Sequence, residues 1–493
     1  MGHCPKMQNS MGANQGAQNS EKTKRFLEET RECPGHAIQK GEDQNQLLPV
    51  PLQMKPFNKL WPALMESKLA IALFAGLLVG AVVLFSVPPQ FSAHGGNGEE
   101  IAPVSVLPPP LKPICDLSDR RYDCCEMWGD ARTASSANRS SVYFIPSPSQ
   151  LATTAVATWS IRSQSRKIVG VREVIVRSLN LSSLREAPNC TVRRSLPAVV
   201  FALGGLTFNY WHAFSDVLVP LFTTARDFGS EVELVATGAQ GWFLNKYGRV
   251  LGALSPYAVV DLDADGEVRC YPHLIVGLRG HRDFDIDSAR APNGYDMLAF
   301  RLFVRAAYSL PPPTAALPCR SGGTKPRLMI ILRGATRRFV NADAVVSAIE
   351  RAGFQVVRME PTSTAGMDAV AREVDACDVL VGAHGAGLTN MVFLRTGAVV
   401  VQVIPWGKME PYGEGFFGAP AAHMGIRHVA YSVAAEESTL YDKYGKAHPV
   451  ITDSDVFYRN GSNAKLYWQE QNIRLNTTRF APTLETVKRM LRL

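Results

Sequence analysis

The second half of the chain alternates apolar runs with amphipathic segments, and this alternation restricts its fold more than any other sequence feature. Near-continuous apolar runs, typical of buried strands, occupy 327–334, 354–361, 378–385 and 398–405. Two segments between them carry apolar residues at helical spacing: 341–353, with Asn341 at its predicted N-cap and Gly353 at its end, and 365–377. Apolar strands that alternate with helices indicate a parallel sheet covered on both faces.

The first half, from 114 to 310, carries a looser version of the same pattern. Its β-rich apolar segments lie at 197–203, 232–238, 257–263 and 272–278, with a helical candidate at 215–228. The stretch 311–326 is rich in proline and glycine and is interpreted as an interdomain linker. We therefore predict an α/β protein with two doubly wound, Rossmann-like domains, 114–310 and 327–493, that face a cleft. The last helix is expected to pack back on the first domain.

A glycine-rich turn, VGAHGAGLTN at 381–390, connects the third predicted strand of the second domain to a short helix. Three glycines surround His384 there, and an open α/β sheet binds its ligand at such turns. Backbone N–H groups at Gly385, Ala386 and Gly387 would favour a phosphate. The spacing G-x-x-G-x-G differs from the G-x-G-x-x-G of dinucleotide-binding enzymes. From the glycines alone, a diphosphate site and a tight structural turn are equally good interpretations.

Cationic side chains lie near that turn in the predicted topology. Arg333 ends the first strand of the second domain, and Arg337 follows in the same loop. Loops at the carboxyl ends of parallel strands share one rim, so we expect both guanidinium groups to face one anion together with the glycine turn. The competing interpretation is a solvated basic loop.

Other polar features are interpreted as structural. Asp263 and Asp265, in DLDADG, have the spacing of metal-binding carboxylates, but they lead into Asp-Gly, a common turn signal. HRDFDID, at 281–287, is read as a polar loop. Seven of the nine cysteines follow residue 88 at spacings that match no zinc site, and Cys377 is predicted to be a buried free thiol. A net charge of +8 without a long Lys/Arg block suits a polyanion or a nucleotide equally well and selects neither; no nucleic-acid partner is predicted.

The N-terminal part contains one charge-free apolar stretch, at 69–87. Its nineteen residues would rise about 28 Å as a helix, close to the roughly 30 Å of bilayer hydrocarbon, and therefore predict a single transmembrane anchor. Lysines precede the stretch, and no Lys or Arg follows it until Lys112, so the positive-inside rule places the polar, disordered tail 1–68 in the cytosol. A Pro/Gly-rich stem, 88–113, leads to the translocated part. That part carries five predicted glycosylation sites: Asn138, Asn180, Asn189, Asn460 and Asn476.

Six motifs occur in order along the chain, at 115–132, 204–222, 333–341, 381–390, 405–433 and 471–487. Together they resemble glycosyltransferase family 61, and most of all its plant branch that decorates xylan with arabinofuranose or xylose. The resemblance implies a type II Golgi membrane protein with a GT-B fold and an inverting mechanism. It implies UDP-arabinofuranose or UDP-xylose as donor, xylan as acceptor, no cofactor, no required metal, and complexes with other Golgi transferases.

The resemblance also suggests roles for individual residues. His212 and Asp216, in NYWHAFSD, share one face of a helix that begins near Asn209. Either Asp216 orients His212, which removes the acceptor proton, or Asp216 is itself the base; the alternative is a structural His–Asp pair. Asn341 closes the R-x-x-T-R-x-F-x-N motif and joins the donor-binding residues. Glu436 or Glu437, in AAEEST, is a candidate contact for the donor ribose, with Glu437 chosen; a solvated surface charge explains this position equally well.

Two alternative functions remain open from the sequence. One is a family member that acts on another acceptor, such as a β-1,2-xylosyltransferase of the N-glycan core. The other is a catalytically weak paralogue that binds polysaccharide or serves as a scaffold. The retained glycine turn, Arg333 and the His212–Asp216 pair argue against the scaffold.

Overall fold

The computed structural model describes residues 113–492 apart from 137–138, 152, 314–324, 361–365 and 460–462. The predicted tail and transmembrane stretch lie outside the described residues, as do the stem up to residue 112 and most of the linker. Within the described ranges, no helix is long and apolar enough to cross a membrane. All described residues belong to one compact unit.

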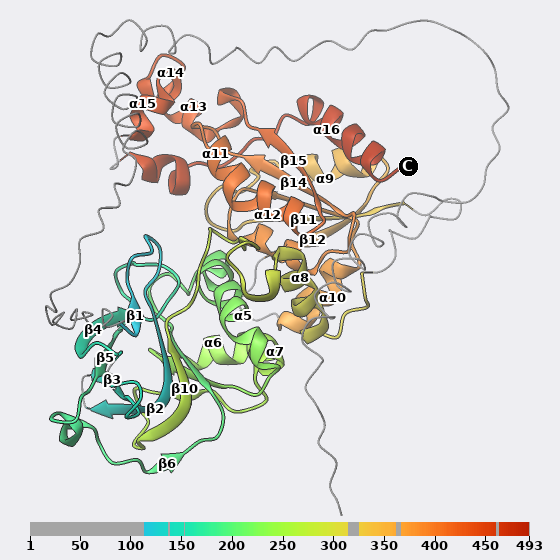
Figure 1. The fold of residues 1–493 in the computed structure, drawn as a ribbon. Helices are drawn as coiled ribbons and strands as arrows, with labels where there is room; N and C mark the ends of the chain where they lie inside the picture. The colour runs from blue at the N-terminus through green and yellow to red at the C-terminus, as the bar shows by residue number, and fades with distance from the viewer. Residues whose placement is uncertain are drawn as a thin grey trace, which may run out of the picture. The chain divides into compact units, whose positions relative to one another are not determined.

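The first half folds around a mixed sheet (Figure 1). Within the described residues this sheet has ten strands in the order β4-β5-β3-β2-β10-β7-β8-β9, with β1 paired to β2 and β6 to β10. The strands are β1 (Cys115–Asp116), β2 (Cys124–Ser136), β3 (Arg139–Ile145), β4 (Ala157–Arg162), β5 (Glu173–Ser178), β6 (Val192–Arg193), β7 (Ala198–Ala202), β8 (Glu233–Thr237), β9 (Val260–Asp261) and β10 (Arg269–Val276).

One side of this sheet matches the predicted parallel pattern, because β10, β7, β8 and β9 pair in parallel. The other side does not, since β2 runs antiparallel to both β10 and β3, and β4 runs antiparallel to β5. The prediction of a doubly wound first domain is therefore wrong for this extension. Buried and more exposed residues alternate along β3, as expected for a strand with one face on the core.

The helical segments of the first half lie mainly between β7 and the linker. They are η2 (Leu184–Glu186), α4 (Tyr210–His212), the π-helical η3 (Ala213–Leu218), α5 (Val219–Ala225), η4 (Arg226–Phe228), α6 (Gly241–Lys246), α7 (Gly248–Leu254), η5 (Pro292–Gly294) and α8 (Met297–Ala307). α4, η3 and α5 follow one another without a break. This stretch begins earlier than the predicted 215–228 because Asn209 caps it: its Oδ1 accepts a hydrogen bond from the Trp211 backbone N–H at 3.0 Å.

The second half folds around a parallel sheet in the order β12-β11-β13-β14-β15 (Figure 1). Its strands are β11 (Arg327–Ile331), β12 (Gln355–Met359), β13 (Val379–Ala383), β14 (Val399–Ile404) and β15 (Arg427–Ser432). All four strand pairings are parallel, as predicted. The four predicted strands are confirmed, and β15 adds a fifth at the edge.

Helices cover both faces of this second sheet. They are α9 (Ala342–Arg351), α10 (Met367–Asp375), the 3₁₀ helix η6 (Ala386–Phe393), α11 (Glu410–Gly413), the π-helical η7 (Glu414–Gly418), α12 (Ala419–His423), η8 (Ala435–Glu437), α13 (Thr439–Tyr444), α14 (Pro449–Thr452), α15 (Ser454–Arg459), the π-helical η9 (Leu466–Glu470) and α16 (Thr477–Met490). α9 and α16 share one apolar core with one face, whereas α10, η6 and α12 share a core with the other. The expectation that the last helix packs back on the first domain is wrong, because α16 packs on α9 and β15.

The two halves share a continuous core. One cluster of buried apolar residues includes Phe214 and Phe300 from the first half and Met329 and Leu380 from the second. α8 adds buried arginines to this joint: Arg301 Nη1 donates to the Leu394 carbonyl at 2.6 Å, and Arg305 Nη2 lies 2.7 Å from an Asp375 carboxylate oxygen. The first half is therefore fixed against η6, the helix that follows the glycine turn.

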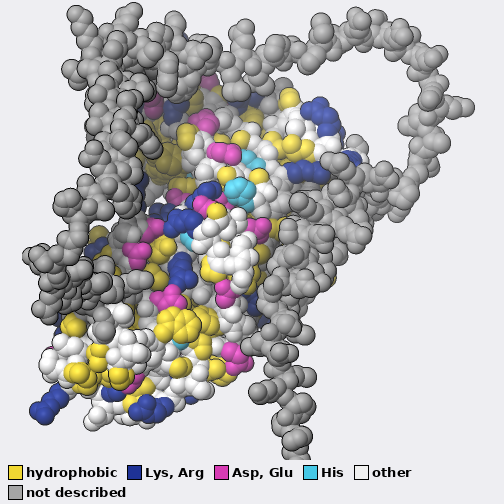
Figure 2. Space-filling view, in the orientation of Figure 1, with side chains coloured by type: hydrophobic (Ala, Val, Ile, Leu, Met, Phe, Trp, Pro, Cys, Tyr) yellow, Lys and Arg dark blue, Asp and Glu magenta, His cyan; other side chains and the backbone are white. Residues whose placement is uncertain are grey.

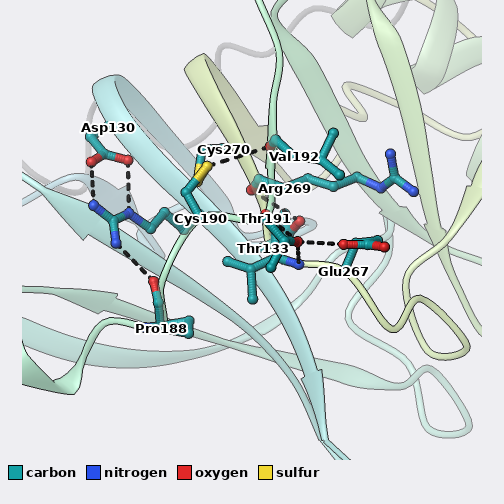
Figure 3. The surroundings of a disulfide bond; sticks show 11 residues. Asp130, Thr133, Pro188, Cys190, Thr191, Val192, Glu267, Arg269 and Cys270 are labelled. Carbon is teal, nitrogen blue, oxygen red and sulfur yellow. Dashed lines mark hydrogen bonds and ion pairs between the residues drawn. A yellow bond between two sulfur atoms is a disulfide. The ribbon is translucent and has the colours of Figure 1, made fainter.

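Two disulfides join cysteines of the first half. Cys115 bonds Cys125, and Cys190 bonds Cys270 (Figure 3). The second bond lies beside the pairing of β6 with β10, and Arg132 Nη1 of the neighbouring β2 donates to the carbonyl of Pro188 at 2.8 Å. In the described part of the chain Cys124 and Cys377 are free, and Cys377 is buried as predicted.

The structure places three of the five predicted glycosylation sites. Asn189 and Asn476 are exposed, whereas Asn180 is half-buried and its Oδ1 accepts hydrogen bonds from Ser182 and Ser183. Asn138 and Asn460 lie outside the described residues. The sequon asparagines therefore differ in access: Asn189 and Asn476 are open to solvent, and Asn180 is partly covered.

Candidate active site

The His212–Asp216 pair forms as the helical spacing predicts. His212 Nδ1 lies 2.7 Å from Asp216 Oδ2, across the junction of α4 and η3. Asp216 is buried, whereas the His212 side chain keeps 18% of its surface accessible. Burial raises the pKa of the Asp216 carboxyl, but the hydrogen bond from His212 and the charge of Arg166 outweigh it, so the pKa lies below its ordinary value. An ionised Asp216 accepts a hydrogen bond from the Nδ1–H group of His212, so Nε2 of the neutral ring is the nitrogen that can accept a proton.

Two arginines lie directly over the glycine turn. Gly385 has a φ of 145°, and a Cβ built there would lie 2.7 Å from Arg333 Nη1 and 3.2 Å from Arg337 Nη1. Arg337 Nη1 donates to the His384 carbonyl at 2.9 Å. Only glycine lets the backbone and both guanidinium groups come this close. The predicted convergence of Arg333, Arg337 and the turn is confirmed.

Within the described part of the chain, these two guanidinium groups have no carboxylate as a counter-charge. Among the described residues, no carboxylate forms an ion pair with Arg333 or Arg337, and Nε of Arg337 is buried without a hydrogen-bond partner. Burial lowers the pKa of Arg333, and burial together with the Arg333 charge lowers the pKa of Arg337 to about 9. Two neighbouring cations that are half desolvated and unneutralised favour an anionic ligand.

His384 is held neutral beside these cations. Burial, followed by the charges of Arg337 and Arg333, lowers its pKa to about 3. The Gln402 amide nitrogen donates to His384 Nδ1 at 2.6 Å, and the Gln402 oxygen lies 2.8 Å from His428 Nε2. Because Nδ1 accepts, the neutral ring carries its hydrogen on Nε2. His384 is therefore a hydrogen-bond donor without charge.

The helix that carries His212 and the helix that follows Gly385 touch. Tyr210 Oη donates to Asn390 Oδ1 at 2.9 Å, which joins α4 to η6. A second connection runs through Phe416 of η7: its ring centroid lies 4.8 Å from Trp211, the neighbour of His212, and 6.2 Å from His384. The candidate base and the candidate anion site therefore belong to one site at the junction of the two halves.

Backbone N–H groups at the turn complete the anion site. Ala386 and Gly387 begin η6, and the first N–H groups of a helix have no partner within it. Both residues are partly exposed, whereas Gly385 is buried. The start of η6, at Ala386 and Gly387, therefore follows directly on the glycine that two guanidinium groups approach, and this combination of groups suits phosphate oxygens.

Two predicted donor contacts, Asn341 and Glu437, have partners within the protein, and their contact with a donor stays a prediction. Asn341 does not cap α9 with its side chain; its Nδ2 donates to the Leu475 carbonyl at 2.9 Å, and its Oδ1 accepts from the Leu475 N–H at 3.0 Å. Glu437 is buried, so the solvated-charge interpretation is wrong. It accepts hydrogen bonds from Tyr431 Oη and from the backbone N–H groups of Ala434 and Asn476, and it pairs with Arg479 at 2.7 Å.

Sequence reasoning missed the residues that complete the site. The ring centroid of Trp468, in η9, lies 5.2 Å from that of His384, and the Arg337 guanidinium lies over the Trp468 ring. Asp283 pairs with Arg121 and Arg166, so part of HRDFDID is an ion-pair element and not merely a polar loop. The sequence feature that could have indicated Asp283 is the group of three aspartates in HRDFDID. Nothing local marks Phe416 or Trp468, because their roles depend on contacts that are distant in sequence.

The paired aspartates of DLDADG form a turn, as predicted. Asp263 accepts hydrogen bonds from Ser140 Oγ at 2.6 Å and from the Gly238 N–H at 2.5 Å. Asp265 pairs with Arg269 at 2.6 Å. Across the described ranges, no group of three His, Cys, Asp or Glu side chains is arranged to hold a metal ion.

Known proteins resemble this chain over most of its length. The family model Glycosyltransferase 61 matches residues 210–401, a range that begins beside His212 and includes the glycine turn. The alpha-1,3-arabinosyltransferase XAT3 of Oryza sativa subsp. japonica is 40% identical over 76% of this chain and 64% of its own length. The beta-1,2-xylosyltransferase XYXT1 of the same organism is 39% identical over 77% of this chain and 84% of its own.

A third relative, the xylan glycosyltransferase MUCI21 of Arabidopsis thaliana, is 31% identical over 75% of this chain and 78% of its own length. The aligned region spans only 64% of the two rice arabinosyltransferases XAT3 and XAT2. The match to XYXT1, at this identity and over this share of both chains, is decisive for membership. The chain belongs to glycosyltransferase family 61.

Proposed function

We propose that this protein is an inverting glycosyltransferase that transfers a pentose, arabinofuranose or xylose, from a UDP-sugar to the xylan backbone or its side chains. One observation carries the proposal: His212–Asp216 and the two unneutralised arginines at Gly385 are joined through the Tyr210–Asn390 hydrogen bond. A base and an anion site at one junction are the parts that a direct displacement at a sugar carbon requires. The similarity to an arabinosyltransferase and a xylosyltransferase supports a pentose as the transferred sugar.

In the proposed reaction, His212 Nε2 takes the proton of the attacking acceptor hydroxyl. The ionised Asp216 holds the ring through Nδ1 and stabilises the imidazolium that forms. The acceptor oxygen bonds to the anomeric carbon while the bond to the diphosphate oxygen breaks, so a single displacement inverts the configuration. Arg333, Arg337 and the N–H groups of Ala386 and Gly387 receive the charge of the departing UDP.

A divalent metal is not needed in this scheme. The two guanidinium groups already supply two positive charges at the position of the diphosphate, and the neutral His384 adds a hydrogen-bond donor. We therefore propose that transfer is independent of added metal and that no other cofactor takes part.

We also propose that the protein acts in the Golgi, as a type II membrane protein with its catalytic part in the lumen. The support is in the sequence: the charge-free stretch 69–87, the lysines before it and the sequons after it. The two disulfides agree with an oxidising compartment. Association with other Golgi transferases belongs to the same proposal.

The test is a transfer assay with purified full-length protein, a panel of UDP-sugars and three acceptors: xylan, xylo-oligosaccharides and an N-glycan. The expected result is pentose transfer to xylan that persists in EDTA, with inverted configuration by NMR. Loss of activity in EDTA would overturn metal independence. Transfer to the N-glycan alone would overturn the xylan assignment, and UDP binding without turnover on any acceptor would favour a scaffold.

A further inference from the structure

A pocket of about 810 Å³ lies in the first half of the chain, and two of its lining arginines approach Asp216, the partner of the candidate base. Its lining includes Arg121 and Arg166. Arg166 Nε lies 3.1 Å from Oδ1 of Asp216, and Arg121 Nη2 lies 3.9 Å from the same oxygen. The other carboxylate oxygen of Asp216 bonds His212. The pocket and the candidate base therefore lie on either side of a single carboxylate.

The wall of this pocket is preformed. Much of it comes from the loop 116–122, which connects β1 to β2 and is closed by the disulfide Cys115–Cys125. Lys167 Nζ holds the same loop, because it donates to the carbonyl oxygens of Leu117 at 3.1 Å and Asp119 at 2.7 Å. A pocket whose wall is fixed in this way needs little ordering when a ligand binds.

The charges around the pocket balance. Five cationic side chains line it: Arg120, Arg121, Arg166, Lys167 and Arg290. Five carboxylates line it or pair with its cations: Asp116, Asp119, Asp123, Asp216 and Asp283. The face drawn in Figure 2 likewise shows basic and acidic side chains interspersed and not separated by sign.

This balance differs from the glycine turn, where two arginines lack any described acidic partner. An anion in the pocket would have to compete with carboxylates that already hold the arginines. A hydroxyl group, in contrast, donates to a carboxylate and accepts from a guanidinium without breaking either pair. His281, in the same lining, is kept neutral, since burial and the Arg290 charge lower its pKa to about 4.

We propose that this pocket is the acceptor subsite and that it binds a neutral, hydroxyl-rich saccharide beside His212. The assignment rests on the proposed function and adds to it the place and the charge class of the acceptor. Arg290 is the residue best suited to test it, because its guanidinium lines the pocket, pairs with Asp119 at 2.6 Å and makes no contact with Asp216.

The experiment measures acceptor and UDP affinities separately in full-length wild type, Arg290→Met and Arg120→Ala, with xylohexaose as the acceptor probe. We expect the acceptor KM, and the Kd for xylohexaose by calorimetry, to rise about tenfold in Arg290→Met. The UDP Kd should stay within twofold. Arg139→Ala is the matched control: it removes an exposed arginine of the same half that does not line the pocket, and should leave both values unchanged.

Ionic strength gives an independent readout. From about 0.05 M to about 0.5 M NaCl, UDP binding should weaken several-fold while xylohexaose binding changes little, because salt screens the attraction between charged groups and xylohexaose carries no charge.

Wild-type xylohexaose affinity in both pocket variants, or tighter binding of a carboxylate-bearing xylo-oligosaccharide, would overturn the inference. If wild type binds xylohexaose through Arg290 but transfers no sugar, the proposed function fails and the subsite stands. If the wild type transfers the sugar normally and Arg290→Met has no effect, the subsite assignment fails and the proposed function stands.

Discussion

Gly385 differs from Gly382 and Gly387 in the groups that approach its backbone. A Cβ at Gly382 or Gly387 would meet Ile331, at 3.2 Å and 3.1 Å, so these two glycines permit close packing of β13 and η6 against β11. A Cβ at Gly385 would meet the guanidinium groups of Arg333 and Arg337 instead. The structural-turn interpretation therefore describes Gly382 and Gly387, whereas the anion-site interpretation stays a prediction for Gly385, where the two guanidinium groups converge.

The first prediction concerns Arg337. Arg337→Ala should weaken UDP binding about 10- to 100-fold, because it removes a partly buried cation that hydrogen-bonds the turn at His384. The control is Arg338→Ala, which removes an exposed arginine from the next position of the same loop. Calorimetric titration with UDP measures both. Equal losses in the two variants would show that the loop acts only through its overall charge.

His384 gives a pH dependence of stability. Its pKa in the folded protein, about 3, is depressed below the ordinary value of 6.5. Between these two values the unfolded chain binds a proton at His384 that the folded chain does not bind. The free energy of unfolding is therefore highest above about pH 6.5 and falls as the pH drops toward 3. Between pH 6.5 and pH 5 this one group should remove about 2 kcal/mol of unfolding free energy. In His384→Gln, urea denaturation should show a shallower pH slope than in wild type; an identical slope contradicts the assignment.

At the scale of elements, three π-helical segments meet around the site. η3 carries Asp216, η7 carries Phe416, and η9 carries Trp468; the last two contact His384. A π-helical turn displaces side chains from regular helical positions and is frequent at functional sites. Here it directs groups from both halves toward one junction.

The next prediction concerns Asp375, at the end of α10, which pairs with an arginine of α8. Asp375 is buried and pairs with Arg305 at 2.7 Å and Arg395 at 3.2 Å. Asp375→Ala should destabilise the protein by about 3–5 kcal/mol, because it leaves buried guanidinium groups without their partner. Asp343→Ala is the control, since Asp343 pairs with Arg358 in an 87% exposed position and should cost less than about 1 kcal/mol. Chemical denaturation of both variants measures the difference.

How much of these elements the sequence reveals depends on the range of the interactions that form them. The parallel strands of the second half were predictable because each is apolar throughout, and Val399 to Val401 are buried on both faces of β14. The antiparallel β2 was not, because its buried positions are Cys, Met, Ala and Thr, which weaken the periodic signal. Arg333, His212 and Asp216 came from local motifs. The side-chain cap at Asn341 and the solvated charge at Glu437 were wrongly predicted because the partners of these residues, Leu475 and Arg479, lie far along the chain.

At the scale of the whole molecule, the shared core makes the two halves one cooperative structure. Apolar residues of both sheets belong to a single buried cluster, and α8 is fixed to η6 by buried arginines. A donor ligand at the glycine turn should therefore stabilise both halves together, although its contacts lie mainly in the second.

This cooperativity predicts one thermal transition by circular dichroism and by tryptophan fluorescence. UDP at about 100 times its Kd should raise unfolding free energy by about 2.7 kcal/mol and move the single midpoint up by a few degrees. Two transitions, of which only one responds to UDP, would show that the halves unfold independently.

The disulfide Cys115–Cys125 gives oxidative folding a selective effect on the reaction. It closes the loop that forms much of the proposed acceptor pocket, whereas neither disulfide of the described residues involves the arginines or peptide groups at Gly385. Under the proposed function, a chain that matures with reduced thiols should still bind the nucleotide sugar. Its loop 116–122 would be less ordered, so its affinity for the polysaccharide acceptor would fall. Hydrolysis of the activated sugar by water would then compete with productive transfer, and the redox state during maturation would determine the product.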